Sequence, residues 1–339
     1  MITKLITEKD GEAGLDEAAG LLRAGELVAI PTETVYGLAA NALDGAAVKN
    51  IFAAKGRPQD NPLIVHIAET EEIIPLVKNF DERARALAKA YWPGPLTMIL
   101  PKSDIIPDEV CAGLDTVAIR MPSHPVAHEI IKKCGFPLAA PSANTSGKPS
   151  PTTAAHVMND MDGKIAAVVD GGSCSVGVES TVVTLACEVP RVLRPGGITP
   201  DQLRAVLGEV EIDKAVFKAL ENGEKVLSPG MKYKHYSPNA RVIIVKGDFD
   251  KFAAFACSRS EKTCAVCFDG EENKLSVPAY PYGHADSPEE QARELFDVLR
   301  HVDDEKMELA LVRFPSLDGV GMAVYNRLLR AAGFEVIEL

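Results

Sequence analysis

Apolar and polar positions alternate along the chain with two periods, and the alternation predicts an α/β protein. Apolar residues three and four positions apart predict helices, whereas short runs rich in Val, Ile and Leu predict strands. Up to residue 207 the predicted helices cover 12–24, 44–54, 81–91, 124–133 and 200–207, and the predicted strands cover 27–31, 62–67, 95–101, 116–122, 137–143, 165–170 and 180–185. Some of these strands follow one another directly and others are separated by helices, which indicates a twisted mixed sheet with helices.

The pattern changes after residue 207 and then becomes regular again. Residues 208–239 include SPGMKYKHYSPN, which is rich in Pro, Gly, Lys and Tyr and has no apolar periodicity, so we expect a linker there. Residues 240–339 alternate predicted strands and helices strictly, which is typical of a smaller parallel, Rossmann-like sheet. No G-x-G-x-x-G follows its first strand, so the sequence does not predict a dinucleotide site.

Composition and length support two soluble domains. The 339 residues exceed what one core usually organises, and 46% are hydrophobic while 25% are charged. No apolar run reaches the length needed to span a bilayer, and the amino-terminal MITKLITEKDG does not resemble a signal peptide, so we expect a cytoplasmic protein. The seven cysteines do not suggest a disulfide framework, and the Cys264/Cys267 pair lies in a predicted strand rather than beside other metal ligands.

The charge distribution argues against a main role in nucleic-acid binding. The formal net charge is −12, and residues 240–339 contribute 12 Lys and Arg against 18 Asp and Glu. Binding to a polyanion requires a basic surface, so only a local basic patch would serve. An RNA-binding protein nevertheless remains the alternative function.

A turn rich in Gly and Pro, KGRPQDNPL (55–63), is the first candidate site for anion binding. Lys55 and Arg57 are two residues apart, so their side chains can converge on one anion, and Asn61 can donate its amide beside them. A solvated loop is the alternative interpretation, and it would be favoured if this segment stood alone.

A second polar segment, PSANTSGKPSPT (141–152), follows a predicted strand. Ser142, Asn144, Ser146 and Ser150 would lie at the carboxyl end of that strand, where α/β sheets bind ligands and where phosphates meet the start of the next helix. The chain has no Walker A motif, so any ATP site must be built in this way. Taken alone, the segment is also compatible with a surface turn.

Two arginines at predicted strand ends complete the candidate chemistry. Arg120 in TVAIRMP is suited to a bidentate contact with a carboxylate, and Arg194 in RVLRPGG is placed to reach a phosphate. Each arginine, if isolated, would more often pair with a surface acid.

Seven motifs in this order resemble the threonylcarbamoyl-AMP synthase family. They are PTETVYGL, KGRPQDNPL, PGPLT, VAIRMP, PSAN-SG, VGVESTVV and RPGGI, and they span nearly all of the first 205 residues. The linker and the α/β tail resemble the long, two-domain form of the family. The resemblance implies a YrdC-like catalytic domain (1–207), a linker or lid (208–239) and a Rossmann-like C-terminal domain (240–339).

The resemblance also implies the reaction. Members convert L-threonine, bicarbonate or CO2 and ATP into threonylcarbamoyl-AMP and pyrophosphate, with Mg²⁺ bridging the phosphates. The product goes to a tRNA threonylcarbamoyl transferase complex, and weak contact with tRNA is expected. No dedicated metal ligands and no membrane contact are implied. A different carbamoyl or phosphoryl transferase built on the same domain is a weaker alternative, because the chain lacks the zinc-finger and acylphosphatase parts of such proteins.

The family pattern assigns roles residue by residue. It implies that Lys55, Arg57, Ser142 and Asn144 form the catalytic polar core, and that Asn61, Thr116, Ser150, Arg194 and Tyr236 complete the ATP contacts. For L-threonine the matching positions are Thr34, His66, Arg120, Ala140 and Ser180. His66 departs from many relatives, which carry lysine there. Tyr236, in the linker, would belong to a lid that excludes water from the adenylate, or would only anchor the linker to the first domain.

Overall fold

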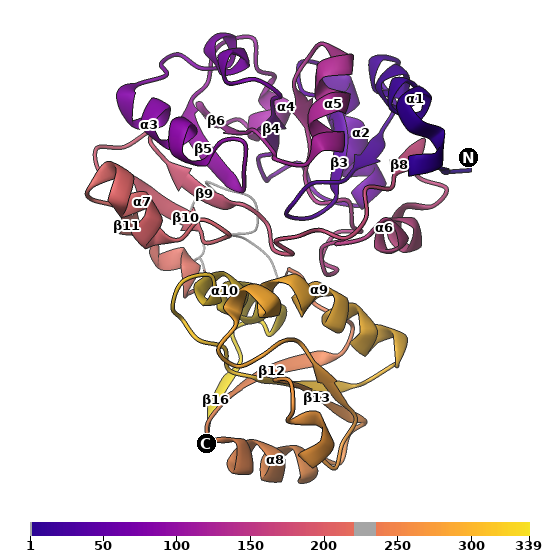
Figure 1. Ribbon diagram of the computed structural model, residues 1–339, viewed down its shortest axis with the longest axis vertical. Coiled ribbons are helices and arrows are strands. Elements are labelled where there is room, and N and C mark those ends of the chain that lie inside the picture. Colours follow the sequence, from indigo (N-terminus) through magenta and orange to yellow (C-terminus); the bar gives the residue numbers. More distant parts are fainter. Residues whose placement is uncertain (1, 220–234) are drawn as a thin grey trace.

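Two sheets organise the molecule. The computed structural model describes residues 2–219 and 235–339, with a larger body that contains the N-terminus and a smaller one that contains the C-terminus (Figure 1). The prediction of a mixed α/β domain followed by a smaller parallel one is confirmed. In the described part of the chain, no helix has the length and apolarity needed to cross a membrane.

The larger body is built on an eleven-stranded mixed sheet with the order β1-β8-β2-β3-β7-β4-β6-β5-β9-β10-β11. Its strands are β1 (Lys4–Ile6), β2 (Val28–Ile30), β3 (Gly37–Asn41), β4 (Ile64–His66), β5 (Leu96–Pro101), β6 (Thr116–Arg120), β7 (Leu138–Ala139), β8 (Ala167–Val169), β9 (Thr181–Thr184), β10 (Arg191–Arg194) and β11 (Glu211–Ile212). Strands β4 and β6 are parallel and place His66 directly beside Arg120. Their carboxyl ends therefore present two predicted site residues together.

Helices cover this sheet and supply its core. They are α1 (Gly11–Arg23), α2 (Gly45–Lys55), α3 (Glu82–Tyr91), α4 (Asp108–Cys111), α5 (Pro125–Cys134), α6 (Ala154–Met161) and α7 (Pro200–Leu207). Helices α1 and α5 pack against each other through Ala18, Leu22 and Ile130, which are fully buried. Their apolar faces have the helical spacing that the sequence predicted.

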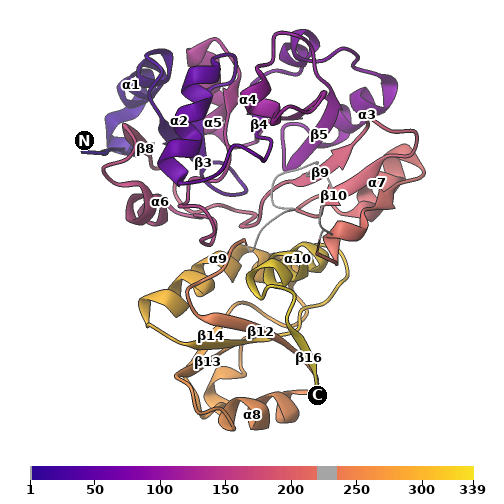
Figure 2. The same cartoon turned by 180° about the vertical axis from the view of Figure 1, so that it is seen from behind.

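The smaller body is a doubly wound parallel sheet with the order β14-β13-β15-β12-β16. It contains β12 (Arg241–Lys246), α8 (Phe249–Cys257), β13 (Thr263–Cys267), β14 (Ala279–Pro281), α9 (Pro288–Asp304), β15 (Leu309–Arg313), α10 (Gly321–Ala331) and β16 (Val336–Glu338). Helices α9 and α10 lie between this sheet and the larger body, and α8 covers the opposite face (Figures 1 and 2). Cys264 and Cys267 lie within β13 and are fully buried, as expected for a core strand.

Several elements were not predicted from the sequence. Strand β3 lies within and after the PTETVYGL motif, and three of its five residues are Ala or Gly, which have low strand propensity. It is stabilised by pairing with β2 and β7 on both sides. Helix α6 and strands β1 and β14 were also missed, because elements of three to eight residues are too short to give a clear periodic signal.

The proposed linker, 208–239, begins with structure that belongs to the larger body. Strand β11 pairs with β10, and the short 3-10 helix η3 (Lys214–Val216) follows it. Residues 228–234 of the SPGMKYKHYSP motif lie outside the described residues. The domain limits at 207 and 240 stay a prediction.

Polar contacts across the boundary hold the two bodies together. The Nη2 atom of Arg300 in α9 lies 3.1 Å from Oδ2 of Asp160 in α6, and both side chains are largely buried. The Nδ2 atom of Asn326 in α10 donates to the carbonyl oxygen of Val216 (2.7 Å). Since buried polar groups require partners, these bonds fix the two bodies in one arrangement.

Candidate active site

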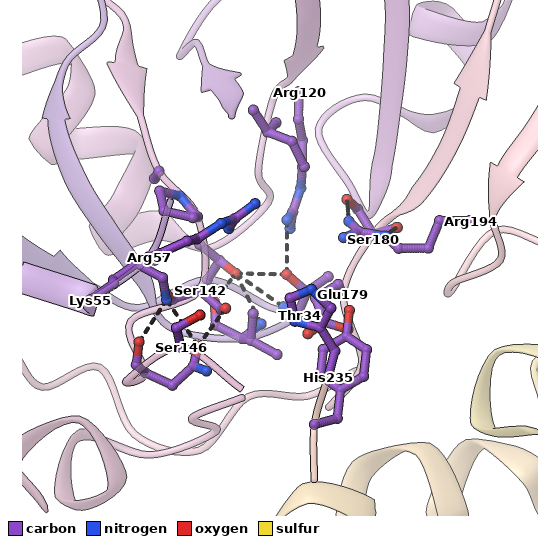
Figure 3. Close-up of a pocket in the computed structure, with 18 of the residues that line it drawn as sticks. Thr34, Lys55, Arg57, Arg120, Ser142, Ser146, Glu179, Ser180, Arg194 and His235 are labelled. Carbon is purple, nitrogen blue, oxygen red and sulfur yellow. Dashed lines mark hydrogen bonds between the residues drawn. The ribbon is translucent and has the colours of Figure 1, made fainter. Parts of the chain in front are cut away.

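A polar hollow opens where the ends of β4 and β6 meet the loop 141–147, Glu179 and Ser180, and the pair His235 and Tyr236 (Figure 3). The empty space within it, open solvent included, is about 720 Å³. Eleven of the predicted site residues line it, namely Thr34, Lys55, Arg57, His66, Arg120, Ala140, Ser142, Asn144, Ser180, Arg194 and Tyr236. The motifs therefore converge on one pocket.

Lys55 is the last residue of α2, and its ammonium group is turned onto the loop 142–144. Its Nζ atom donates to the carbonyl oxygens of Ser142 (2.5 Å) and Asn144 (2.6 Å) and to Oδ1 of Asn144 (3.2 Å). Burial lowers the pKa of Lys55, and the charge of Arg57 lowers it further. Three acceptors nevertheless require three N–H donors, which only the ammonium form has. Lys55 thus tethers this loop in its charged form.

The turn after α2 directs Arg57 to the same side of the pocket. Gly56 ends the helix with φ of +63°, a left-handed conformation that suits glycine, and the chain then reverses. Figure 3 shows Lys55, Arg57, Ser142 and Ser146 on one side of the hollow, and Ser180 and Arg194 on the other. An anion bound between the two sides would face an arginine on each, Arg57 and Arg194.

The loop 142–147 is held by its own side chains. Oγ of Ser142 donates to Oδ1 of Asn144 (2.6 Å), and Nδ2 of Asn144 donates to the carbonyl oxygens of Thr145 and Lys148 (2.9 Å each). The amide of Ser146 donates to the carbonyl oxygen of Lys55 (3.0 Å). The expectation that the next helix would point its N-terminus at the ligand is not met, because α6 begins at Ala154 and its first turn does not line the pocket.

Arg120 is fixed at the end of β6, as the sequence predicted, but its partners were not foreseen. Its Nη2 atom lies 2.7 Å from Oε1 of Glu33, and its Nη1 atom donates to Oγ1 of Thr34 (2.8 Å). All three side chains are buried. The ion pair orients the guanidinium group, which lines the pocket and is suited to a carboxylate ligand.

His66 lies beside Arg120 and is uncharged. Its Nδ1 atom donates to the carbonyl oxygen of Ile64 (3.1 Å). Burial, together with the positive charge of Arg120, lowers the pKa of His66 to about 3. A neutral imidazole supplies a hydrogen-bonding wall to the pocket rather than a third cation.

The neutral state of His66 predicts a pH-dependent contribution to stability. Its pKa in the folded state is below that in the unfolded state, so the unfolded state takes up a proton first as the pH falls. The stabilisation is complete above about pH 6.5 and is lost as the pH falls toward the folded pKa. Between pH 8 and pH 5 the free energy of unfolding therefore decreases by about 2 kcal/mol. We expect His66→Gln to lose about 2 kcal/mol less than the unchanged protein over this interval in urea denaturation. Equal losses in the two proteins would contradict the assignment.

Ser180 and Arg194 form the opposite wall. Nε of Arg194 donates to the carbonyl oxygen of Ser180 (3.0 Å), and its Nη2 atom donates to the Ser180 hydroxyl (3.1 Å). That hydroxyl also lies 2.8 Å from Oγ1 of Thr97. Burial lowers the pKa of Arg194, but an arginine stays charged at any physiological pH. The strand ends β9 and β10 therefore present one cation and one hydroxyl.

Three predicted ATP contacts do not line the pocket. Asn61 is fully buried, and neither atom of its amide has a hydrogen-bond partner among the described residues, which a ligand would remedy. Ser150 is also buried and donates to Oε1 of Glu179 (2.5 Å). Thr116 starts β6, about 13 Å along the strand from Arg120 at the other end. Their roles stay predictions.

Tyr236 connects the pocket with the C-terminal body. It is buried, its ring lies 5.3 Å from that of Phe296 in α9, and the next residue, Ser237, donates its amide to the carbonyl oxygen of Gly147 (2.9 Å). His235 also lines the pocket, and burial with the charges of Arg57 and Lys55 lowers its pKa to about 4. The next residue along, Ser237, thus bonds to the loop that Lys55 holds.

The sequence interpretation missed two buried carboxylates, Glu33 and Glu179. Each stands inside a quoted motif, PTETVYGL and VGVESTVV, directly before a predicted threonine contact. The available signal was a carboxylate with threonine on both sides for Glu33, and one between Val178 and Ser180 for Glu179. A buried acid requires a cationic partner. Among the described residues, the group of three side chains with metal-ligand spacing is Asp269, His284 and Glu290, in the C-terminal body and not in this pocket.

Two joined α/β bodies and a buried, cationic, hydroxyl-rich pocket define an enzyme that acts on an anionic small molecule. Residues 20–196 match the family model of Sua5, YciO and YrdC proteins, described as telomere recombination, and residues 198–333 match the model described as threonylcarbamoyl-AMP synthase, C-terminal domain. The chain belongs to the threonylcarbamoyl-AMP synthase family.

Individual relatives agree over the full length. A threonylcarbamoyl-AMP synthase from Pyrococcus abyssi is 46% identical over 98% of both chains, and one from Bacillus subtilis is 48% identical over 95% of this chain and 93% of its own. The crystal structure of P. abyssi Sua5 complexed with L-threonine superposes with a TM-score of 0.91 at 45% identity, covering 100% of each chain.

Proposed function

We propose that this enzyme joins L-threonine, bicarbonate or CO2 and ATP into threonylcarbamoyl-AMP and pyrophosphate. The observation that carries the proposal is the pairing of two anion sites in one pocket. Arg120, held by Glu33, is suited to the carboxylate of an amino acid, and Lys55, Arg57 and the loop 142–147 are suited to a triphosphate. Relatives that match both domains carry the name of this activity.

The pocket would act by positioning and charge stabilisation. The amine of threonine adds to the carbon of CO2 and releases a proton, which gives a carbamate. With bicarbonate, the amine adds to its carbon and one water leaves in place of that proton. A carbamate oxygen then attacks the α-phosphorus, and the bond from this phosphorus to the β-phosphate oxygen breaks, releasing pyrophosphate. Arg57 and Arg194 would offset the charge on the departing phosphates. This route requires no nucleophilic side chain.

Magnesium would be held mainly by the substrate. Glu179 is the acidic residue among the described pocket residues, and both of its carboxylate oxygens already have partners, Ser150 and Arg327. The donor set therefore fits an ion bound through phosphate oxygens and water rather than a protein cage. When bound, the ion would neutralise phosphate charge.

The direct test is pyrophosphate release from ATP with Mg²⁺ and bicarbonate, measured with and without L-threonine and with L-serine as control. Threonine-dependent release together with an AMP-linked product is expected. Release that is indifferent to the amino acid would overturn the proposal. Tight, salt-sensitive RNA binding without turnover would support the RNA-binding alternative instead.

The proposal includes a cytoplasmic location and transfer of the product to a tRNA threonylcarbamoyl transferase complex. The adenylate is a reactive mixed anhydride, so rapid transfer to an acceptor limits its hydrolysis. With a net charge of −12, we propose that contact between this chain and tRNA is weak.

Tyr236 provides a test of the lid. Tyr236→Ala is expected to lower kcat/KM for ATP about tenfold or more, because water enters beside the adenylate, and to lower catalysis more than thermal stability. Tyr325→Ala removes a half-buried tyrosine of the same body that does not line the pocket, and it should leave the activity of the folded protein unchanged. Unchanged activity in Tyr236→Ala would contradict the lid proposal and would mean that Tyr236 only anchors the linker.

A further inference from the structure

Arg327 belongs to α10 in the C-terminal body. It is the largest fully buried side chain among the described residues, although it carries a charge. Its Nε atom lies 2.7 Å from Oε2 of Glu179, and its Nη2 atom donates to the carbonyl oxygen of the same residue (3.0 Å). Its Nη1 atom donates to the carbonyl oxygen of Pro195 (2.8 Å) and to Oδ1 of Asn326 (3.0 Å). The side chain thus reaches across the domain boundary with each of its nitrogens bonded.

Glu179 transmits this contact to the active site. It lines the pocket, and its second carboxylate oxygen accepts a hydrogen bond from Oγ of Ser150 (2.5 Å). The three side chains Arg327, Glu179 and Ser150 therefore form one continuous buried chain of bonds. The Arg327 guanidinium also lies 5.8 Å from the ring centre of Tyr236, another pocket residue.

The segment that carries Glu179 is also pressed against the C-terminal body. Gly177 has a φ of +80°, and a Cβ atom there would lie 2.3 Å from Cα of Arg293 and 2.5 Å from the carbonyl oxygen of Ala292, both in α9. Only glycine permits so close an approach in this conformation. The position of Glu179 is thus set by the C-terminal body at two points, through α9 and through α10.

The charge of Glu179 makes its partner important for a triphosphate ligand. Burial raises the pKa of Glu179, but the charges of Arg327 and Arg194 outweigh this and keep the pKa below its usual value, so the carboxylate is ionised. An uncompensated carboxylate in this pocket would repel phosphates and would draw Arg194 toward itself.

We propose that Arg327 is a positioning residue of the nucleotide site, contributed by the C-terminal domain: it fixes and neutralises the Glu179 carboxylate, which lines the pocket that would hold a nucleoside triphosphate. This inference rests on the proposed function for its ligand. It makes the C-terminal domain part of the ATP site rather than an appended module.

The test compares charge variants by steady-state kinetics and by direct binding of MgATP in calorimetry. Arg327→Gln is expected to raise KM and Kd for ATP about tenfold or more, with a smaller change in KM for threonine. Glu179→Gln combined with Arg327→Gln should recover part of the ATP affinity, because it removes the unpaired negative charge. Arg327→Lys keeps the charge but cannot bond in three directions, so its ATP affinity should lie between those of Arg327→Gln and the unchanged protein.

Asp297→Asn is the matched control. It weakens another contact between the two bodies, in which Oδ1 of Asp297 lies 3.1 Å from Nε2 of His156, and neither residue lines the pocket. It should leave ATP affinity unchanged. Equal ATP affinity in Arg327→Gln and the unchanged protein would overturn the inference, and so would an equal loss in Asp297→Asn. If Arg327→Gln does not fold, the double variant and Arg327→Lys decide. If the unchanged protein binds MgATP but shows no threonine-dependent release of pyrophosphate, only the proposed function is contradicted. The MgATP affinities of the variants would still test the role of Arg327.

Discussion

Replacing Arg120 with glutamine is expected to lower threonine-dependent pyrophosphate release about 100-fold, with most of the effect in KM for threonine. Arg120 is the cation at the amino-acid end of the pocket, and its buried guanidinium is pre-oriented by Glu33 and Thr34. A glutamine amide offers one donor group in place of a charged fork. A loss of 100-fold corresponds to about 2.7 kcal/mol, which is in the range of one charge-assisted bidentate contact.

The same substitution should also destabilise the fold, and a second variant separates the two effects. Removing one partner of a buried ion pair costs about 3–5 kcal/mol, because Glu33 is left with an uncompensated charge. The double variant Glu33→Gln/Arg120→Gln removes both charges and should recover most of the melting temperature without recovering activity. A single variant that keeps its KM for threonine would show that Arg120 is only structural.

A surface arginine on the same sheet provides the matched control. Arg191 pairs with Glu211 at 3.0 Å, and both side chains are more than 40% exposed. Exposed pairs contribute about 0–1 kcal/mol, so Arg191→Gln should change neither activity nor melting temperature appreciably. Parallel losses in Arg191→Gln and Arg120→Gln would point to a general effect of removing charge.

Replacing Lys55 with methionine should give the second large effect. Methionine fills a similar volume but donates no hydrogen bond, so the carbonyl oxygens of Ser142 and Asn144 lose their buried partner. Bonds from a charged donor contribute about 1.5–3 kcal/mol each, so we expect the unfolding free energy to fall by about 3 kcal/mol or more. Because the loop 142–147 then loses its fixed shape, kcat/KM for ATP should fall about 100-fold.

Denaturant unfolding and ATP kinetics of Lys55→Met test this role together. Lys148→Met is the control, since Lys148 follows the same loop but is 46% exposed and lies 3.7 Å from Asp160. It should behave like the unchanged protein. A Lys55→Met protein with full stability and poor ATP turnover would mean that the ammonium group serves the phosphates and not the loop.

The sequence by itself determined the class of fold and predicted many of the residues that line the pocket, but not Glu179 or His235. Apolar periodicity is a local property, so it predicted the longer helices and the strands with clear apolar runs, but not the eight-residue helix α6. Gly56 and the Pro-rich turns are local as well, which is why KGRPQDNPL and PSANTSGKPSPT could be recognised as ligand-binding segments. The resemblance of seven ordered motifs then assigned roles, and eleven of the assigned residues line one pocket.

Only the tertiary structure decided how these residues are used. Lys55 beside the phosphates stays a prediction, whereas the bonds of its ammonium group to backbone oxygens 87 and 89 residues away are seen only in the structure. Arg120 and Thr34 are 86 residues apart, and Arg327 and Glu179 are 148 apart. No periodicity or spacing encodes such pairs. Which acid neutralises which arginine depends on packing and on burial, because a charge in a low-dielectric interior must find a partner wherever the chain brings one within reach.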